Sequence, residues 1–83
     1  LKQNYPNPFN PVTNISFSLP EAGSVKLAVY DAAGREVAGL VNRTLSAGIY
    51  NFDFNASNIS SGVYFYRLTA GEFTGIRKMI LIK

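Results

Sequence analysis

Apolar and polar residues alternate along most of this 83-residue chain, and this alternation constrains its fold more than any other feature. A period of two places successive side chains on opposite faces of a strand, so each such run predicts a strand with one face in the core. No segment has the 3.6-residue period of an amphipathic helix. The clearest alternating runs place an apolar residue at every second position: Ile15, Phe17 and Leu19, then Tyr50, Phe52 and Phe54.

Turn residues divide the chain into short segments at spacings of about ten residues. Asp31 and Gly34 occupy the first and fourth positions of a predicted type I turn, which joins two strands into a hairpin. Further breaks fall at residues 46–48 and 70–72. Short strands at this spacing are typical of a sandwich, and a small barrel is the alternative architecture. We therefore predict an all-β fold, an immunoglobulin-like antiparallel β-sandwich of about seven strands.

Side-chain orientation is predictable for some of these strands and ambiguous for others. Arg67 belongs on a solvent face, so its alternating neighbours Tyr64, Tyr66 and Leu68 are expected to face inward. The loop at residues 56–62 holds one apolar residue, Ile59, which we expect to plug the core.

Two strands are less regular. In the strand at 35–41, Val37 and Val41 are expected to share one face and Leu40 the other, with a bulge near Gly39. The run at 76–82 is apolar on both faces, so its period does not orient it.

The N-terminal segment, residues 1–12, differs from the rest of the chain because it contains three closely spaced prolines. Pro6, Pro8 and Pro11 lack N–H donors and have fixed φ angles, which excludes a helix or an internal strand. We name residues 1–12 the lead-in and expect it to be an extended, rigid linker to a preceding domain, with residues 13–83 forming the sandwich. Tyr5 and Phe9 are its expected packing anchors.

Composition narrows the possible functions. The chain has no His and no Cys, so it lacks the commonest general base, the thiol nucleophile and the usual zinc ligands, and we expect no enzyme activity and no cofactor. The net charge is +3, and the surplus lies in Arg77, Lys78 and Lys83 at the C-terminal end. That charge is too small and too local for nucleic-acid binding, and no apolar run is long enough to span a membrane.

The start at Leu1 is typical of a piece of a longer precursor.

Two binding interpretations compete with purely structural ones. Asp31, Asp53 and Asn55 are potential calcium ligands, but no Asp-rich loop motif is present, and we interpret them as turn formers. The Tyr and Phe residues are able to form a sugar-binding platform, but most lie on predicted core faces. We therefore expect no metal site and rank carbohydrate binding below the alternatives.

Several short motifs, taken together and in order, resemble the type A C-terminal sorting domain of the type IX secretion system. A similar pattern occurs in the immunoglobulin-like domain of flagellar hook-cap assembly proteins, which is the main competitor. The resemblance covers practically the whole chain, and its motifs are Tyr5-Pro6-Asn7-Pro8-Phe9-Asn10-Pro11, Leu19-Pro20-Glu21, Val29-Tyr30-Asp31 followed by Gly34, Ala47-Gly48, Ser61-Gly62-Val63-Tyr64 and Lys78-Met79-Ile80-Leu81-Ile82-Lys83.

This resemblance implies a function in protein export. A sorting domain of this family directs an N-terminal cargo domain of the same bacterial precursor across the periplasm and through the type IX outer-membrane translocon to the cell surface or medium. Its implied partners are translocon and shuttle proteins and a sortase-like peptidase. The family motifs correspond to residues 6–10, 62–64 and 78–83, and the candidate recognition residues are Pro6, Asn7, Pro8, Phe9, Asn10, Gly62, Tyr64, Lys78 and Lys83.

The residues themselves leave more than one role open for these motifs. Gly62 and Tyr64 are expected to have mainly structural roles, Tyr64 as the tyrosine corner of a sandwich. The last strand either offers a backbone edge and positive charge to a partner or is a solvated edge protected by Lys. The alternative function for the whole chain is a passive immunoglobulin-like linker or assembly domain.

Overall fold

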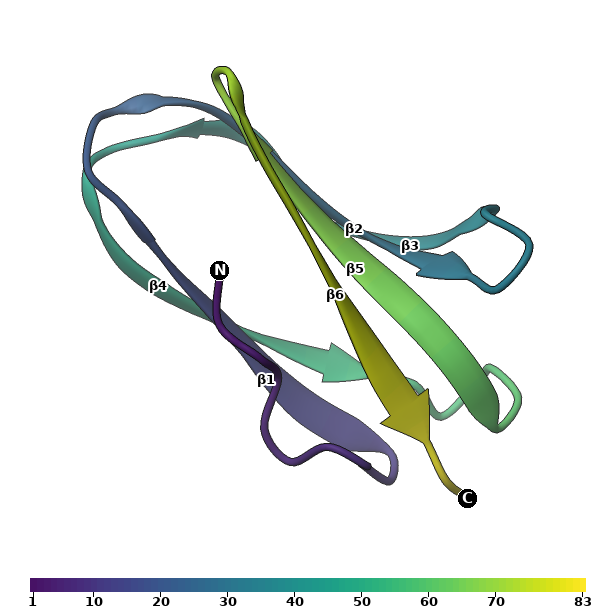
Figure 1. Cartoon of the computed structure of the whole chain (residues 1–83). Helices are drawn as coiled ribbons and strands as arrows, with labels where there is room; N and C mark the ends of the chain where they lie inside the picture. Colours follow the sequence, from purple (N-terminus) through teal and green to yellow (C-terminus); the bar gives the residue numbers. More distant parts are fainter.

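The computed structural model describes residues 1–83 and contains six strands and no helix. Accordingly, no helix is long and apolar enough to cross a membrane. Two antiparallel sheets, ordered β1-β4 and β3-β2-β5-β6, lie against each other (Figure 1). The predicted all-β, sandwich-like fold is confirmed, with six strands in place of about seven. The strands are β1 (Val12–Leu19), β2 (Gly23–Asp31), β3 (Glu36–Leu45), β4 (Gly48–Asn55), β5 (Gly62–Ala70) and β6 (Phe73–Leu81).

The core lies where the alternating apolar faces of the two sheets meet. Phe17 of β1 stacks on Tyr50 and Phe52 of β4, with ring centroids 5.5 Å and 5.9 Å away. Ile59 packs against the core from its loop, as predicted. The inward orientation of the alternating β5 residues is also confirmed. The largest fully buried side chains are Tyr66, Phe17, Ile15, Leu27, Leu68, Met79, Leu81, Val25, Val29 and Thr13.

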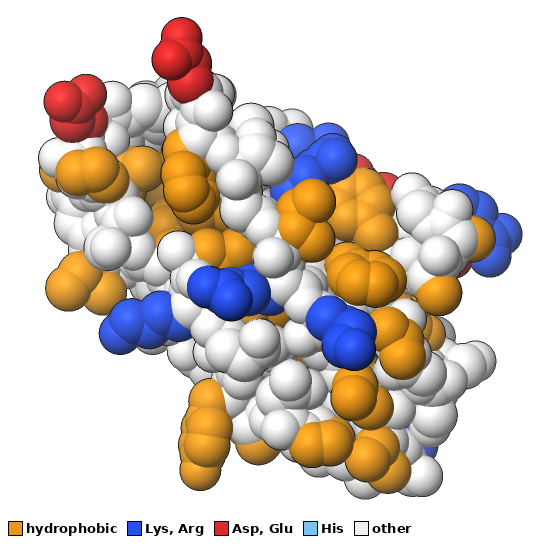
Figure 2. Space-filling model, in the orientation of Figure 1, with side chains coloured by type: hydrophobic (Ala, Val, Ile, Leu, Met, Phe, Trp, Pro, Cys, Tyr) orange, Lys and Arg blue, Asp and Glu red, His pale blue; other side chains and the backbone are white.

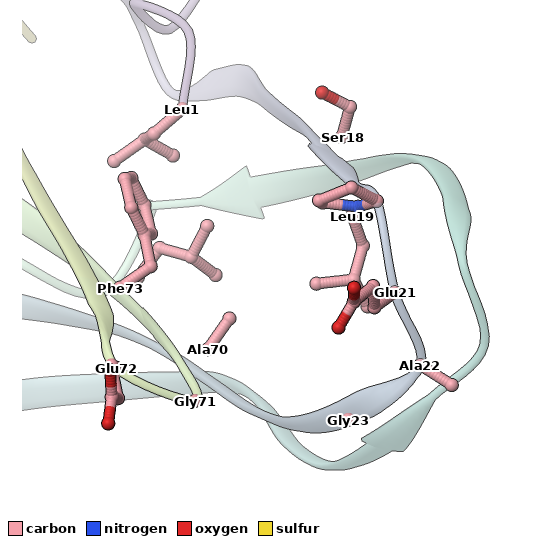
Figure 3. Close-up of a pocket in the computed structure, with 12 residues that line it drawn as sticks. Leu1, Ser18, Leu19, Glu21, Ala22, Gly23, Ala70, Gly71, Glu72 and Phe73 are labelled. Carbon is pink, nitrogen blue, oxygen red and sulfur yellow. The ribbon is translucent and has the colours of Figure 1, made fainter.

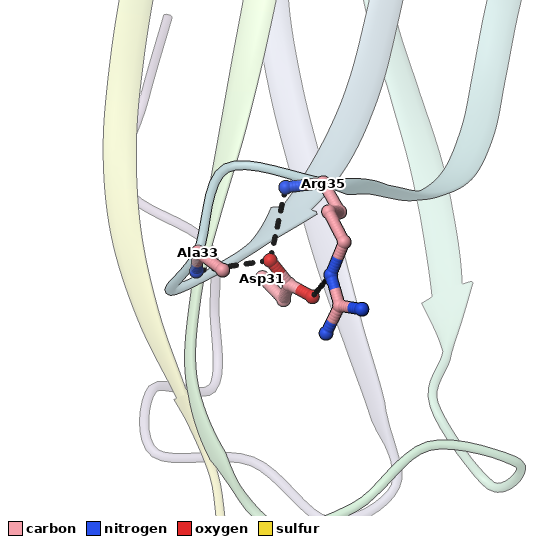
Figure 4. Close-up of polar contacts among 3 residues, drawn as sticks. All are labelled: Asp31, Ala33 and Arg35. Carbon is pink, nitrogen blue, oxygen red and sulfur yellow. Dashed lines mark hydrogen bonds and ion pairs between the residues drawn. The ribbon is translucent and has the colours of Figure 1, made fainter.

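The turn between β2 and β3 forms as its residues predict. The Gly34 N–H donates to the Asp31 carbonyl at 3.0 Å, and Gly34 has a φ of 87°, a conformation that glycine adopts without strain. The Asp31 carboxylate accepts the N–H groups of Ala33 and Arg35 at 3.0 Å and 2.9 Å (Figure 4). It also pairs with the Arg35 guanidinium at 3.0 Å. The backbone N–H of Arg35, together with its charge, lowers the pKa of Asp31.

Strand β3 is bulged on both sides of Gly39. The pairing of β2 with β3 shifts register twice, so the predicted bulge is confirmed. The predicted orientation of Val37 is wrong, because each bulge inserts one extra residue and breaks the period of two. Ala38 and Val41 pair with buried residues of β2, whereas Val37 is exposed.

The orientation of β6, which its sequence leaves open, is set by its pairing with β5. Met79 lies opposite the inward-facing Tyr64 and is fully buried, and Leu81 is buried on the same face. Ile76 and Ile82 lie on the other face and are more than half exposed. The outer face of β6 and the residue after it therefore expose apolar side chains on both sides of Lys78.

The lead-in packs along both sheets (Figure 1). Tyr5 exchanges backbone hydrogen bonds with Asn14 of β1, and Phe9 forms a parallel bridge to Leu81 of β6. Phe9 is 2% exposed, which confirms it as a packing anchor, but Tyr5 is 81% exposed, so that prediction is wrong. The buried neighbour Asn4 takes the inward position, and the alternation of side chains then turns Tyr5 toward solvent.

Candidate functional site

The three family-motif segments, far apart in the sequence, meet at one corner of the molecule. Strand β5 begins at Gly62, which lies opposite Leu81 of β6, and Tyr64 lies opposite Met79. Phe9 bridges to Leu81 from the other side of β6. The C-terminal strand is thus flanked by both other motifs. We name residues 6–10, 62–64 and 78–83 the motif corner.

The lead-in covers the outer edge of β6. Phe9 donates its N–H to the Ile80 carbonyl and accepts the N–H of Ile82, both at 3.0 Å. The Asn7 side-chain oxygen accepts the Ile80 N–H at 3.0 Å, and the Gln3 side chain donates to the Lys78 carbonyl at 2.7 Å. Residues 78–82 of this edge are therefore already paired within the chain, so neither an edge offered to a partner nor a solvated edge describes this part of the last strand.

The remaining lead-in motif residues differ in exposure. The Pro6 carbonyl accepts hydrogen bonds from the buried side chains of Asn4, at 3.1 Å, and Thr13, at 2.8 Å. Asn4 and Thr13 also bond to each other at 2.9 Å. Pro8 and Asn10 are exposed. The prolines therefore define a turn whose inner side is held by buried polar groups and whose outer side is accessible.

Gly62 and Tyr64 shape the loop before β5. Gly62 has a φ of 154°, a conformation that side chains disfavour. The Tyr64 hydroxyl donates to the Ser60 carbonyl at 2.6 Å, which is the geometry of a tyrosine corner. Tyr64 is 7% exposed, so its ring belongs to the core. Both residues have a clear structural role here.

The two motif lysines occupy different environments. Lys83 donates its backbone N–H to Ser61 at 3.0 Å and its ammonium group to the Ser57 carbonyl at 2.8 Å, which ties the C-terminus to the loop before β5. Lys78 is exposed, lies opposite Phe65 and forms no ion pair. Figure 2 shows Lys and Arg side chains among hydrophobic ones over this part of the molecule. Lys78 is therefore the motif cation that is available to a partner.

Several contacts of the lead-in lie outside the predicted site residues. The Tyr66 hydroxyl donates to the Lys2 carbonyl at 2.6 Å, and burial raises the pKa of Tyr66. Arg77 donates to the Leu1 carbonyl at 3.3 Å and 3.2 Å. No local sequence pattern predicts either contact, because each joins residues more than 60 positions apart.

A cleft lies away from the motif corner, between the sheets at the end that carries the β5–β6 turn. It has a volume of about 530 Å³, and its apolar lining includes Leu1, Leu19 and Phe73 (Figure 3). A smaller hollow of about 360 Å³ adjoins the motif corner and is lined by Asp31, Arg35, Gly62 and Tyr64, among others. No three His, Cys, Asp or Glu residues gather where they would hold a metal ion.

The fold is that of a small all-β domain whose C-terminal strand is held between the two other motifs. The sequence matches a family described as the secretion system C-terminal sorting domain over residues 3–83, and the chain belongs to this family of type IX sorting domains. Such a domain acts as a C-terminal secretion signal, interacts with the type IX machinery and leads to export to the cell surface or medium; the family is in general non-catalytic. A search of curated proteins found no match.

Proposed function

We propose that this chain carries a cargo domain of the same precursor from the periplasm through the type IX outer-membrane translocon. Shuttle and translocon proteins read the motif corner, and a sortase-like peptidase separates the cargo from the domain after export. The observation that supports this proposal is the meeting of the three motif segments at one corner.

Each set of motif residues has its own part in this proposal. Asn7 and Phe9 hold the lead-in on β6, while Pro6, Pro8 and Asn10 shape its exposed turn. Gly62 and Tyr64 fix the loop to which Lys83 is tied. Lys78 supplies an unpaired positive charge beside an apolar face, which favours encounter with an acidic partner surface.

A reporter fusion tests the proposal. A periplasm-targeted reporter enzyme is fused ahead of the chain and expressed in a host with a working type IX translocon and in the same host with the translocon inactivated. We expect reporter activity on the surface or in the medium of the first host and retention in the periplasm of the second. Retention in both hosts would refute the sorting function. Export from both hosts would show that the reporter leaves the cell by another route. The reporter without the chain is the control.

A further inference from the structure

The two sheets have four edge strands, and these differ in whether the lead-in covers their outer backbone groups. The lead-in covers the outer edge of β1, where the Lys2 and Tyr5 N–H groups donate to the Ser16 and Asn14 carbonyls at 3.1 Å and 3.0 Å. It also covers the outer edge of β6, as described above. The edges of β3 and β4 have no neighbouring strand. The lead-in thus covers part of the two strand edges on one side of the sandwich, whereas the edges of β3 and β4 have no such cover.

Of the two open edges, β3 is poorly suited to pair with another strand. Its two register shifts distort the ladder, and an edge with bulges resists regular strand addition. Glu36 and Arg43 place charges of both signs along it. Strand β4, in contrast, pairs with β1 over its full length without a register shift and contains no Pro, Lys or Arg.

The direction of the free backbone groups of β4 follows from the contacts of β1. The backbone groups of Asn14 and Ser16 point to the lead-in, so the odd-numbered residues of β1 bond to the even-numbered residues of β4. The N–H and C=O groups of Ile49, Asn51 and Asp53 therefore point outward. They form an unpaired ladder in a regular strand.

The side chains beside this ladder indicate what kind of strand fits it. Ile49 is 80% exposed. Tyr50 and Phe52 lie on the core face and are only half buried, so apolar residues of an added strand would extend the core there. On the opposite face, Asp53 accepts a hydrogen bond from Asn14 at 3.0 Å and forms no ion pair, so it favours a basic residue.

We infer that the β4 edge is a binding site for an extended segment of a partner protein, in which apolar residues alternate with basic ones. Backbone hydrogen bonds to Ile49, Asn51 and Asp53 supply the pairing, the half-buried aromatic side chains receive the apolar residues, and the Asp53 carboxylate receives the basic ones. This site is separate from the motif corner and goes beyond the proposed sorting function.

The test measures amide hydrogen exchange by NMR on the isotope-labelled chain with three synthetic peptides. One peptide alternates valine and lysine, the second has the same composition with the valines grouped, and the third alternates valine and glutamate. We expect the lysine-alternating peptide alone to slow exchange at Ile49, Asn51 and Asp53, by about tenfold or more, because these N–H groups become hydrogen bonded. Protection at β3, or none at millimolar peptide, would overturn the inference.

Three variants separate backbone pairing from charge. Asn51→Pro removes an outward N–H and is expected to weaken binding by about tenfold, whereas Asn51→Thr keeps the N–H and binds within about twofold of the parent. Asp53→Lys should transfer the preference to the glutamate peptide, a result that does not depend on a proline being tolerated. An unchanged preference in Asp53→Lys would contradict the charge assignment. Self-association of the parent chain through β4, seen by sedimentation, would make a second copy the occupant and overturn the proposed partner.

Discussion

Individual residues at the turns of this sandwich act through hydrogen bonds to the backbone. Tyr64 and Tyr50 show the same geometry, in which each hydroxyl donates at 2.6 Å to the carbonyl four residues earlier. Asp31 instead accepts two backbone N–H groups within its own turn. The roles of Tyr64 and Asp31 follow from local sequence signals, because each bond spans at most four residues.

Removal of the Tyr64 hydroxyl tests the tyrosine corner. Tyr64→Phe loses the bond to Ser60 but keeps the buried ring, so we expect the free energy of unfolding to fall by about 0.5–1.5 kcal/mol. Urea denaturation measures this change. Tyr30→Phe is the matched control, because the Tyr30 hydroxyl bonds the exposed Arg67 side chain and its loss is expected to cost less than about 0.5 kcal/mol. Equal losses in the two variants would contradict the corner assignment.

The Asp31 turn predicts an acid-sensitive contribution to stability. Because the folded-state pKa of Asp31 is lowered, its contribution is fully present above the unfolded-state pKa of about 4 and is lost as pH falls through the folded value. We expect Asp31→Asn to lower stability at neutral pH and to reduce the loss of stability below about pH 4. Thermal melts between neutral and acidic pH measure both effects. A parallel pH profile for parent and variant would show that the Asp31 turn contributes nothing.

At the scale of elements, the sequence predicts the strands with clear alternation and is less informative elsewhere. The inward faces of β1 and β5 are correctly predicted, because Ser16 and Ser18 of β1 and Arg67 of β5 mark the opposite face of each strand as polar. Val37 is wrongly oriented because bulges break the period, and β6 has no predictable orientation because both of its faces are apolar. In the lead-in, Phe9 and Tyr5 look alike in sequence, and only the three-dimensional contacts distinguish them.

Phe9 and Tyr5 form a matched pair for testing how the lead-in is held. Phe9 is buried against β6 and contacts Phe54 with a centroid distance of 6.2 Å. We expect Phe9→Ala to reduce the free energy of unfolding by about 3–5 kcal/mol. Tyr5→Ala should change it by less than about 0.5 kcal/mol, because that side chain is exposed. If the urea melts of the two variants coincide, the lead-in is a detached linker.

At the scale of the whole molecule, the motif corner arises from topology. The hairpin of β5 and β6 brings residues 62–64 beside residues 78–83, and a sequence with a clear turn at residues 70–72 makes that pairing predictable. The return of the lead-in to β6 is not predictable in the same way, because it depends on Asn7 and Phe9 bonding to residues more than 70 positions away. The closed edge of β6 is therefore a finding of the structure alone.

If the export machinery reads the motif corner, reporter fusions that differ there by one charge should differ in the amount of reporter that is exported. Lys78→Gln removes the free cation of the motif corner, and Arg43→Gln removes another exposed cation, on β3. Both should keep stability within about 0.5 kcal/mol of the parent. We predict that export falls by about tenfold for Lys78→Gln and remains at the parental level for Arg43→Gln. Parental export of a folded Lys78→Gln fusion, or an equal fall in both variants, would show that the export machinery does not read Lys78 in the motif corner.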